Sequence, residues 1–181
     1  MPSSKLKKLN FGCGSNKFSN CINIDINEEL KPDLILDFQK FPYPFKDNSI
    51  SNIYLFHTIE HLPKIEHPSI LIEFHRILHS DGQLIISYPE FVKIAQAFVD
   101  NRFGWRYSFW EATIYGRQTT KHDFHVCAMV TEEFTQLLQE VGFNIVETKS
   151  ETKQDFNTLV VCSKGTRGMT REEGVYKEIW G

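Results

Sequence analysis

The sequence lacks the cysteine spacing of a disulfide-stapled or zinc-binding protein. Its four cysteines, among 181 residues, form no C-x-x-C pair and follow no regular spacing. This excludes the usual frameworks of small secreted domains and zinc knuckles. Cys13 lies between two glycines and Cys162 lies within an apolar run, so we expect both to be reduced thiols. The cysteine pattern therefore favours a protein of the cytoplasm.

Long hydrophobic runs and a strong net charge are also missing. No apolar stretch approaches the roughly 20 residues of a membrane-spanning helix, and the N-terminal sequence has no apolar core of a secretory signal. Twenty basic against 23 acidic residues give a net charge of −3, which provides no electrostatic footprint for nucleic acid. We therefore expect a cytoplasmic protein that binds neither membranes nor nucleic acid.

What the sequence does contain is the alternation of short apolar runs and amphipathic stretches that is typical of an α/β domain. Its length fits one such domain, which we assign to residues 1–165, with a C-terminal tail at 166–181. Helical periodicity predicts helices in residues 69–79, 90–100 and 131–141. Strands are predicted in residues 6–11, 21–25, 33–37, 50–56, 83–88, 143–149 and 156–163, the last two as an antiparallel hairpin.

A glycine loop and two acidic residues follow three consecutive predicted strands. Gly12 and Gly14 come directly after the first strand, where the absence of a Cβ lets a backbone turn sharply against a ligand. Asp25 ends the second strand, where an acidic residue accepts hydrogen bonds from ribose hydroxyls. Asp37 ends the third, beside an aromatic residue, Phe38. Because ligands bind open α/β sheets at the carboxyl ends of the strands, these residues predict a nucleotide site.

The stretches LNFGCGSN, NCINIDI, DLILDFQKFPYPFKDNSISNIYLFHTIEHL and ILHSDGQLIISYP, in this order over residues 8–90, resemble the class I S-adenosylmethionine-dependent methyltransferases. The resemblance implies a Rossmann-like sheet, S-adenosylmethionine as cofactor and methyl transfer to an acceptor. It also implies the residues that hold the cofactor: Gly12, Cys13 and Gly14 beside its methionine part, Asp25 on the ribose, Asp37 and Phe38 on the adenine, and Phe56 and His57 near the sulfonium and its methyl group.

The spacing of these motifs is shorter than the usual fingerprint. Asp25 follows Gly14 by only 11 positions, against about 20 in a dinucleotide fingerprint, and a parallel crossover normally needs a dozen or more residues. We therefore expect the first crossover helices to be shortened or missing. One face of the sheet would then need another cover: the aromatic segment 102–129, the tail 166–181 or a second subunit of a homodimer.

The resemblance implies a second interpretation of the segment 102–129, as a lid over the methyl acceptor. A base is optional in methyl transfer, since alignment of the two reactants does most of the work. The candidate bases are His57, His61, His122 and His125, and the candidate acceptor contacts are Tyr88, Tyr107, Tyr115 and Arg117. In the cover interpretation, aromatic residues of the segment, such as Trp110, pack on the bare sheet instead. The expected acceptor is a small molecule or a sugar.

Other functions stay open at this point. His57, Glu60 and His61 match the H-x-x-E-H signature of inverted zinc proteases, but the preceding strand and Pro63 leave little room for the required helix, so we expect no metal. A non-catalytic regulator that binds S-adenosylmethionine would keep the nucleotide pocket and lack an acceptor cavity. A nicotinamide-dependent oxidoreductase shares the glycine loop and the acidic residue at the end of the second strand.

Overall fold

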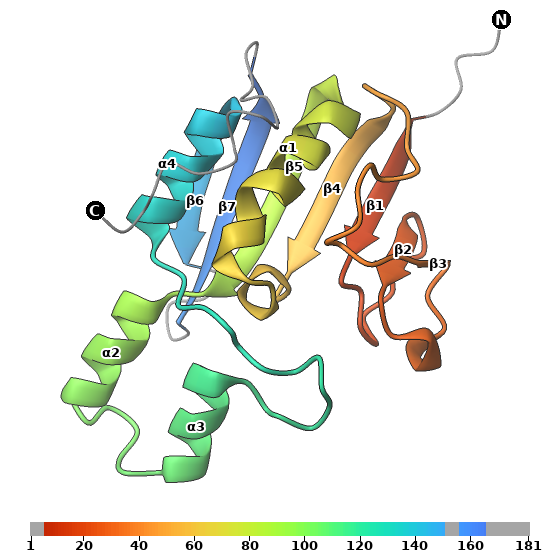
Figure 1. The fold of residues 1–181 in the computed structure, drawn as a ribbon. Coiled ribbons are helices and arrows are strands. Elements are labelled where there is room, and N and C mark those ends of the chain that lie inside the picture. The colour runs from red at the N-terminus through yellow and green to blue at the C-terminus, as the bar shows by residue number, and fades with distance from the viewer. Residues whose placement is uncertain (1–5, 151–155, 166–181) are drawn as a thin grey trace, which may run out of the picture.

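The computed structural model describes residues 6–150 and 156–165, and within them it forms one seven-stranded sheet (Figure 1). The strand order is β3-β2-β1-β4-β5-β7-β6, parallel except for β7, which runs antiparallel to both β5 and β6. The predicted Rossmann-like sheet with a terminal hairpin is confirmed. The strands are β1 (Lys7–Phe11), β2 (Ile22–Asp25), β3 (Leu34–Ile35), β4 (Ile50–Phe56), β5 (Leu78–Pro89), β6 (Phe143–Ser150) and β7 (Asn157–Lys164). The helices are α1 (His67–Ile77), α2 (Phe91–Val99), α3 (Tyr107–Tyr115) and α4 (Thr131–Val141), with short 3-10 turns η1 (Glu28–Leu30), η2 (Ile59–His61) and η3 (Lys64–Glu66).

The core lies between the sheet and the two helices α1 and α4, which cover the same face (Figure 1). Ile70 and Phe74 of α1 are fully buried, as are Leu84 and Ile86 of β5. Burying each large apolar side chain stabilises the fold by about 1.5–3 kcal/mol. Helix α4 ends at Gly142, which adopts the left-handed conformation with φ 110°, as the sequence predicts for a helix C-terminus. This face therefore holds the parallel strands at fixed positions.

The opposite face of the sheet has no helix within the described ranges. Residues 12–21 join β1 to β2 without one, and the next crossover contains only η1, so the predicted loss of the first crossover helices is confirmed. Tyr54, Ile85 and Val161 are neighbours across β4, β5 and β7 and are only half-buried. Cover of this face by the tail, which lies outside the described residues, or by a second subunit stays a prediction.

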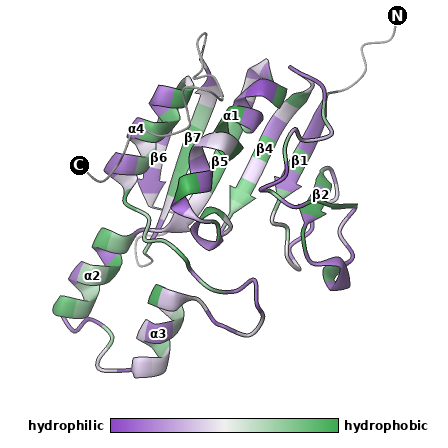
Figure 2. Ribbon diagram, viewed as in Figure 1, coloured by the Kyte–Doolittle hydropathy of each residue, from purple (hydrophilic) through white to green (hydrophobic). Residues whose placement is uncertain are grey.

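The segment 102–129 does not cover that face. Helices α2 and α3 lie beyond the carboxyl ends of the strands (Figure 1), where Trp110 packs on Ile94 and Ala97 in a cluster separate from the main core. The indole N–H of Trp110 also donates to the carbonyl of Gly104 at 3.1 Å. The cover interpretation is therefore wrong for this segment, because its aromatic residues pack on α2, whose sequence is strongly apolar (Figure 2).

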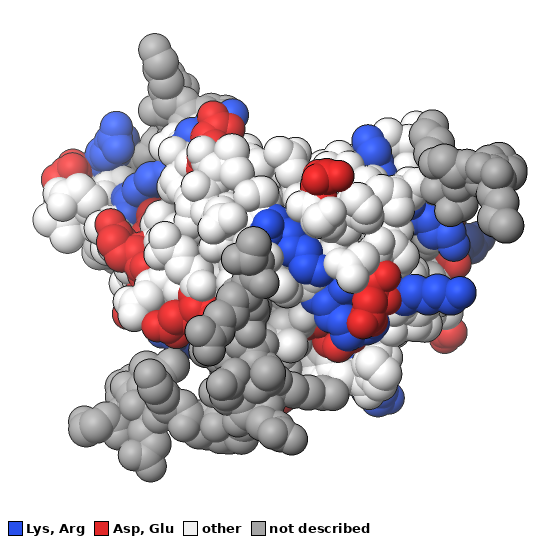
Figure 3. All heavy atoms as spheres, turned by 90° about the horizontal axis from the view of Figure 1, so that it is seen from above, with Lys and Arg blue, Asp and Glu red and all other residues white. Residues whose placement is uncertain are grey.

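Surface charge and helix length bear on the partners that the chain can bind. On the face seen in Figure 3, Lys and Arg side chains lie interspersed with Asp and Glu. Several charged side chains of the described residues form ion pairs, such as Arg76 with Asp47 and Glu73. Among the helices that the structure describes, none is long and apolar enough to cross a membrane.

Candidate functional site

The glycine loop after β1 is tied to the end of β2 by the Asp25 carboxylate. The backbone N–H of Gly14 donates to Asp25 Oδ2 at 2.8 Å, and that of Asn27 donates to Oδ1 at 2.9 Å. Gly12 and Gly14 have φ angles of 65° and 51°, which side chains with a Cβ rarely adopt. Each carboxylate oxygen keeps acceptor capacity beyond these bonds. The carboxylate is thus fixed at the edge of the loop and can still bind a hydroxyl group.

Gly12 also lies directly against Thr58, which follows β4 by two residues. A Cβ at position 12 would overlap the whole Thr58 side chain, whose hydroxyl donates to the carbonyl of Phe56 at 3.0 Å. At Gly14, by contrast, a Cβ would meet no atom within 4 Å. The loop is therefore packed at its first glycine and open at its second, which fits a ligand that approaches the backbone at Gly14 and reaches Asp25.

The other residues predicted to contact the cofactor differ in the exposure and the contacts of their side chains. Asp37 is partly exposed, and its carboxylate accepts from the N–H of Gln39 at 3.0 Å. The Phe38 ring packs edge-on against Phe11 in the core, and the Phe38 carbonyl accepts from the Tyr43 hydroxyl at 2.9 Å. Phe56 points to the helix-free face, where it contacts Phe18. Cys13 is buried, and burial raises the pKa of its thiol.

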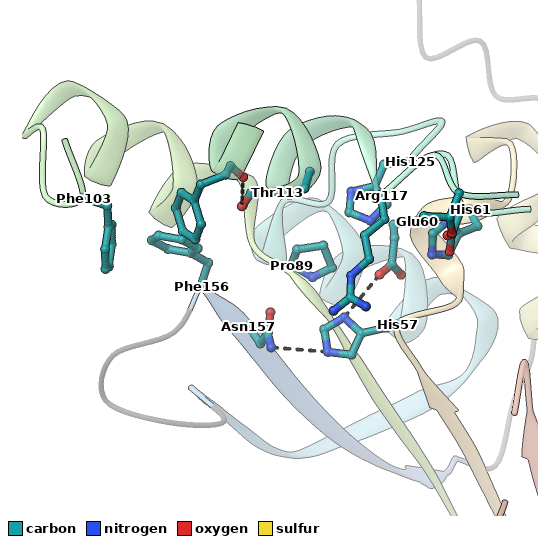
Figure 4. Close-up of a pocket in the computed structure, with 14 residues that line it drawn as sticks. His57, Glu60, His61, Pro89, Phe103, Thr113, Arg117, His125, Phe156 and Asn157 are labelled. Carbon is teal, nitrogen blue, oxygen red and sulfur yellow. Dashed lines mark hydrogen bonds and ion pairs between the residues drawn. The ribbon is translucent and has the colours of Figure 1, made fainter. Parts of the chain in front are cut away.

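A pocket of about 860 Å³ opens where β4 and β5 end and β7 begins, beneath α3 (Figure 4). Figure 4 shows aromatic side chains at one end and the histidines, Glu60 and Arg117 at the other. The volume is that of a small-molecule site. Its lining consists of His57, Glu60, His61, Pro89, Phe103, Phe109, Ala112, Thr113, Arg117, Thr119, Asp123, His125, Phe156 and Asn157.

The polar end is built on the turn after β4. His57 has a positive φ of 48°, and such backbone strain in a non-glycine residue clusters at functional sites. Its Nδ1 lies 3.4 Å from Glu60 Oε1, and its Nε2 lies 3.3 Å from Asn157 Nδ2. Residues 59–61 form a 3-10 turn, so His57 and His61 do not share one face of an α-helix. The zinc-protease interpretation of H-x-x-E-H is therefore wrong.

The end of the segment 102–129 contacts the same end of the pocket. The N–H of Val126 donates to the carbonyl of Glu60 at 2.9 Å, and the ring of His125 contacts that of His61 at a centroid distance of 5.0 Å. Burial lowers the pKa of His125. His61 Nδ1 lies 2.9 Å from the carbonyl of Phe124, so this nitrogen carries the proton. Two segments more than 60 residues apart thus meet at the pocket.

The pocket includes some predicted residues and leaves others out. His57, His61, His125 and Arg117 line it, whereas His122, Tyr107 and Tyr115 are exposed elsewhere. Tyr88 is fully buried, its hydroxyl 3.3 Å from Thr131 Oγ1, and burial raises its pKa. Sequence reasoning missed Glu60, Asp123, Asn157 and the aromatic lining by Phe103, Phe109 and Phe156. Of these, only Glu60 carried a signal, as part of the H-x-x-E-H motif.

Comparison with known proteins adds a family and a set of similar folds. Residues 4–148 match the family model described as a methyltransferase domain. A methyltransferase of Methanosarcina mazei described as SAM-dependent has 17% identity and a TM-score of 0.64, over 91% of this chain and 95% of that one. A Thermotoga maritima protein described as a possible histamine N-methyltransferase has 16% identity and a TM-score of 0.60, over 90% and 84%. No curated protein matches the sequence. The structural likenesses show the fold.

Proposed function

The chain belongs to the methyltransferase-domain family, and we propose that it transfers the methyl group of S-adenosylmethionine to a small-molecule acceptor in the pocket beneath α3. One observation carries this proposal. Thr58 packs on Gly12 of the glycine loop, while its neighbour His57 lines the pocket. The predicted donor site and the pocket therefore meet at two consecutive residues, which is the arrangement that a direct transfer between two bound molecules requires.

The donor side consists of the residues at the ends of the first three strands. When bound, S-adenosylmethionine supplies a methyl group activated by a positively charged sulfur. In this proposal the backbone of Gly12, Cys13 and Gly14 holds its amino-acid part, and Asp25 accepts hydrogen bonds from its ribose. Asp37 and Phe38 contact its adenine, and His57 lies at the reacting end. The open backbone at Gly14 and the fixed carboxylate of Asp25 support this assignment.

The acceptor side selects a molecule with an apolar part and a polar group. The rings of Phe103, Phe109 and Phe156 offer an aromatic surface at one end. At the other end Arg117 offers a guanidinium, which binds carboxylate and phosphate oxygens in a fork. A sugar or an aromatic metabolite with an oxygen-bearing substituent fits this division. The mixed surface charge supports a small acceptor over a nucleic acid.

The protein's own contribution is alignment and exclusion of water. Holding two reactants in line is the largest part of such catalysis, and the lid formed by α2, α3 and the segment 116–129 encloses the acceptor. His57, His61 and His125 lie at the polar end and are the candidate catalytic residues that can contact the acceptor. His122 lies outside this group. The existence of an acceptor cavity beside the donor loop favours an enzyme over a non-catalytic regulator.

The state of the four cysteines agrees with a reducing compartment. All four are free thiols in the structure, and disulfides are rare where thioredoxin and glutathione keep thiols reduced. We infer that the protein works in the cytoplasm.

A substitution that fills the pocket with a large side chain tests the proposal. Ala112 lines the pocket from α3, whereas its neighbour Glu111 is exposed. With labelled S-adenosylmethionine and fractionated cell extract, we expect label to enter molecules below the size of a protein. Ala112→Trp should abolish that transfer while binding of S-adenosylhomocysteine stays within twofold, and Glu111→Trp should leave both unchanged. Label in protein or nucleic acid, or full transfer by Ala112→Trp, would overturn the assignment of the acceptor site.

A further inference from the structure

The side-chain carboxylate of Glu60 is buried. Its side chain is 1% exposed, and neither oxygen has a hydrogen-bond partner among the residues the structure describes. The ring of His57 lies beside it, with Nδ1 3.4 Å from Oε1, and carries a charge only when it is protonated. Buried carboxylates are normally paired, hydrogen-bonded or bound to a metal, since an isolated one is strongly disfavoured. The surroundings of Glu60 therefore call for a cation.

Two histidines face this carboxylate. One ligand atom from each of Glu60, His61 and His125 lies within 4.8 Å of the other two, a spacing that one ion could bridge. The proton on His61 Nδ1, held by the Phe124 carbonyl at 2.9 Å, leaves the lone pair on its other ring nitrogen. Metal-binding histidines commonly use one nitrogen for the ion and the other for a carbonyl in this way.

The three side chains are positioned by bonds that do not need an ion. His67, itself buried, has Nε2 3.1 Å from both the Ile59 and the Leu62 carbonyls, one on each side of Glu60 and His61. The Val126 N–H donates to the Glu60 carbonyl, which fixes the neighbouring His125 over the turn. A preformed set of ligands lowers the conformational cost of binding.

From these observations we propose that Glu60, His61 and His125 bind a divalent transition-metal ion at the polar end of the pocket. Two imidazoles and one carboxylate suit zinc or manganese, whereas magnesium and calcium prefer oxygen ligands alone. Three protein ligands leave coordination positions open, and all three residues line the pocket (Figure 4). An open position would take an oxygen of the acceptor, a hydroxyl or a carboxylate. This last step rests on the proposed function, whereas the metal site does not.

The metal site is tested by titrating the chelator-treated full chain with zinc, manganese and magnesium chlorides in a calorimeter. We expect one zinc or manganese per chain and at least tenfold weaker magnesium binding. Glu60→Gln and His125→Gln should each weaken zinc binding by at least tenfold. His122→Gln, which changes an exposed histidine of the same segment, should bind zinc like the wild type. No binding by the wild type, or equal binding by all three variants, would overturn the proposal.

Two further readouts separate this site from folding and from the proposed function. Glu60→Gln replaces a buried carboxylate that accepts no hydrogen bond from the described residues, so without metal it should melt no lower than the wild type, and zinc should raise the melting temperature of the wild type alone. If Glu60→Gln melts at a lower temperature than the wild type without metal, groups of the protein itself stabilise the Glu60 carboxylate, and the proposal would be overturned. Binding of S-adenosylhomocysteine, measured on the same samples, should be the same for Glu60→Gln as for the wild type. If the wild type does not bind S-adenosylhomocysteine, that result would contradict the proposed function but would leave the zinc result standing.

Discussion

Gly12 and Thr58 are in such close contact that only glycine fits at position 12. The contact joins the loop after β1 to the turn after β4, two segments that are 46 positions apart in the chain. It also explains why this glycine, with φ 65°, differs in role from Gly14, whose surroundings are open. The distance between the glycine loop and the pocket beneath α3 is set at this contact.

The contact predicts unequal effects of two similar substitutions. Gly12→Ala adds a steric overlap to the cost of a left-handed backbone, which is about 1–2 kcal/mol per residue, whereas Gly14→Ala carries the backbone cost alone. We expect urea unfolding to show the larger loss of stability for Gly12→Ala. Adding Thr58→Gly should restore part of that loss. Equal destabilisation by the two alanine variants would contradict the contact.

Asp25 should contribute both to the loop and to the ligand. Asp25→Ala removes the acceptor for the Gly14 N–H and the proposed ribose contact, so S-adenosylhomocysteine should bind more weakly by about 1–3 kcal/mol. Asp25→Asn keeps one carbonyl oxygen for Gly14 and should lose less. Calorimetry measures both. Unchanged affinity of Asp25→Ala would place the ribose elsewhere.

His67 predicts a loss of stability in acid. Burial lowers its pKa from 6.5 to about 4, so between these values the unfolded chain takes up a proton that the folded chain does not. The contribution of His67 to the free energy of unfolding is therefore fully present above pH 6.5. It falls by roughly 3 kcal/mol as the pH drops toward 4. His67→Gln keeps an N–H donor for the two carbonyls and does not titrate.

The measurement is the free energy of unfolding in urea at several pH values between 4 and 7. The slope should be shallower for His67→Gln than for the wild type, while His122→Gln, with its exposed side chain, should keep the wild-type slope. A parallel decline in wild type and His67→Gln would show that other groups cause the acid sensitivity.

The lid should open without unfolding the domain. Trp110 packs with Ile94 and Ala97 in a cluster of its own, so the roughly 3–5 kcal/mol that a buried Trp→Ala change costs should fall on local opening. For Trp110→Ala we expect faster amide hydrogen exchange in residues 104–115 and unchanged exchange in β4 and β5. Acceleration throughout the sheet would mean that the lid and the core unfold together.

The strands of the sheet could be predicted from the sequence because the signals for them are local. Apolar runs ending at Gly12, Asp25 and Asp37, together with the short spacing between them, predicted both the strand pattern and the missing crossover helices. The pocket beneath α3 was less predictable, since α3 has a weak apolar pattern and its aromatic residues fit a lid as well as a sheet cover. The meeting of Glu60 with His125 depends on a tertiary contact across more than 60 residues, and no local pattern encodes it.

We expect this chain to hold S-adenosylmethionine at the loop between Gly12 and Asp25. Calorimetric titration of the purified full chain with S-adenosylhomocysteine, and with NAD as a control, tests it most directly. We expect one site per chain with a dissociation constant on the order of micromolar and no binding of NAD. A folded sample that binds no S-adenosylhomocysteine, or that binds NAD in its place, would contradict it.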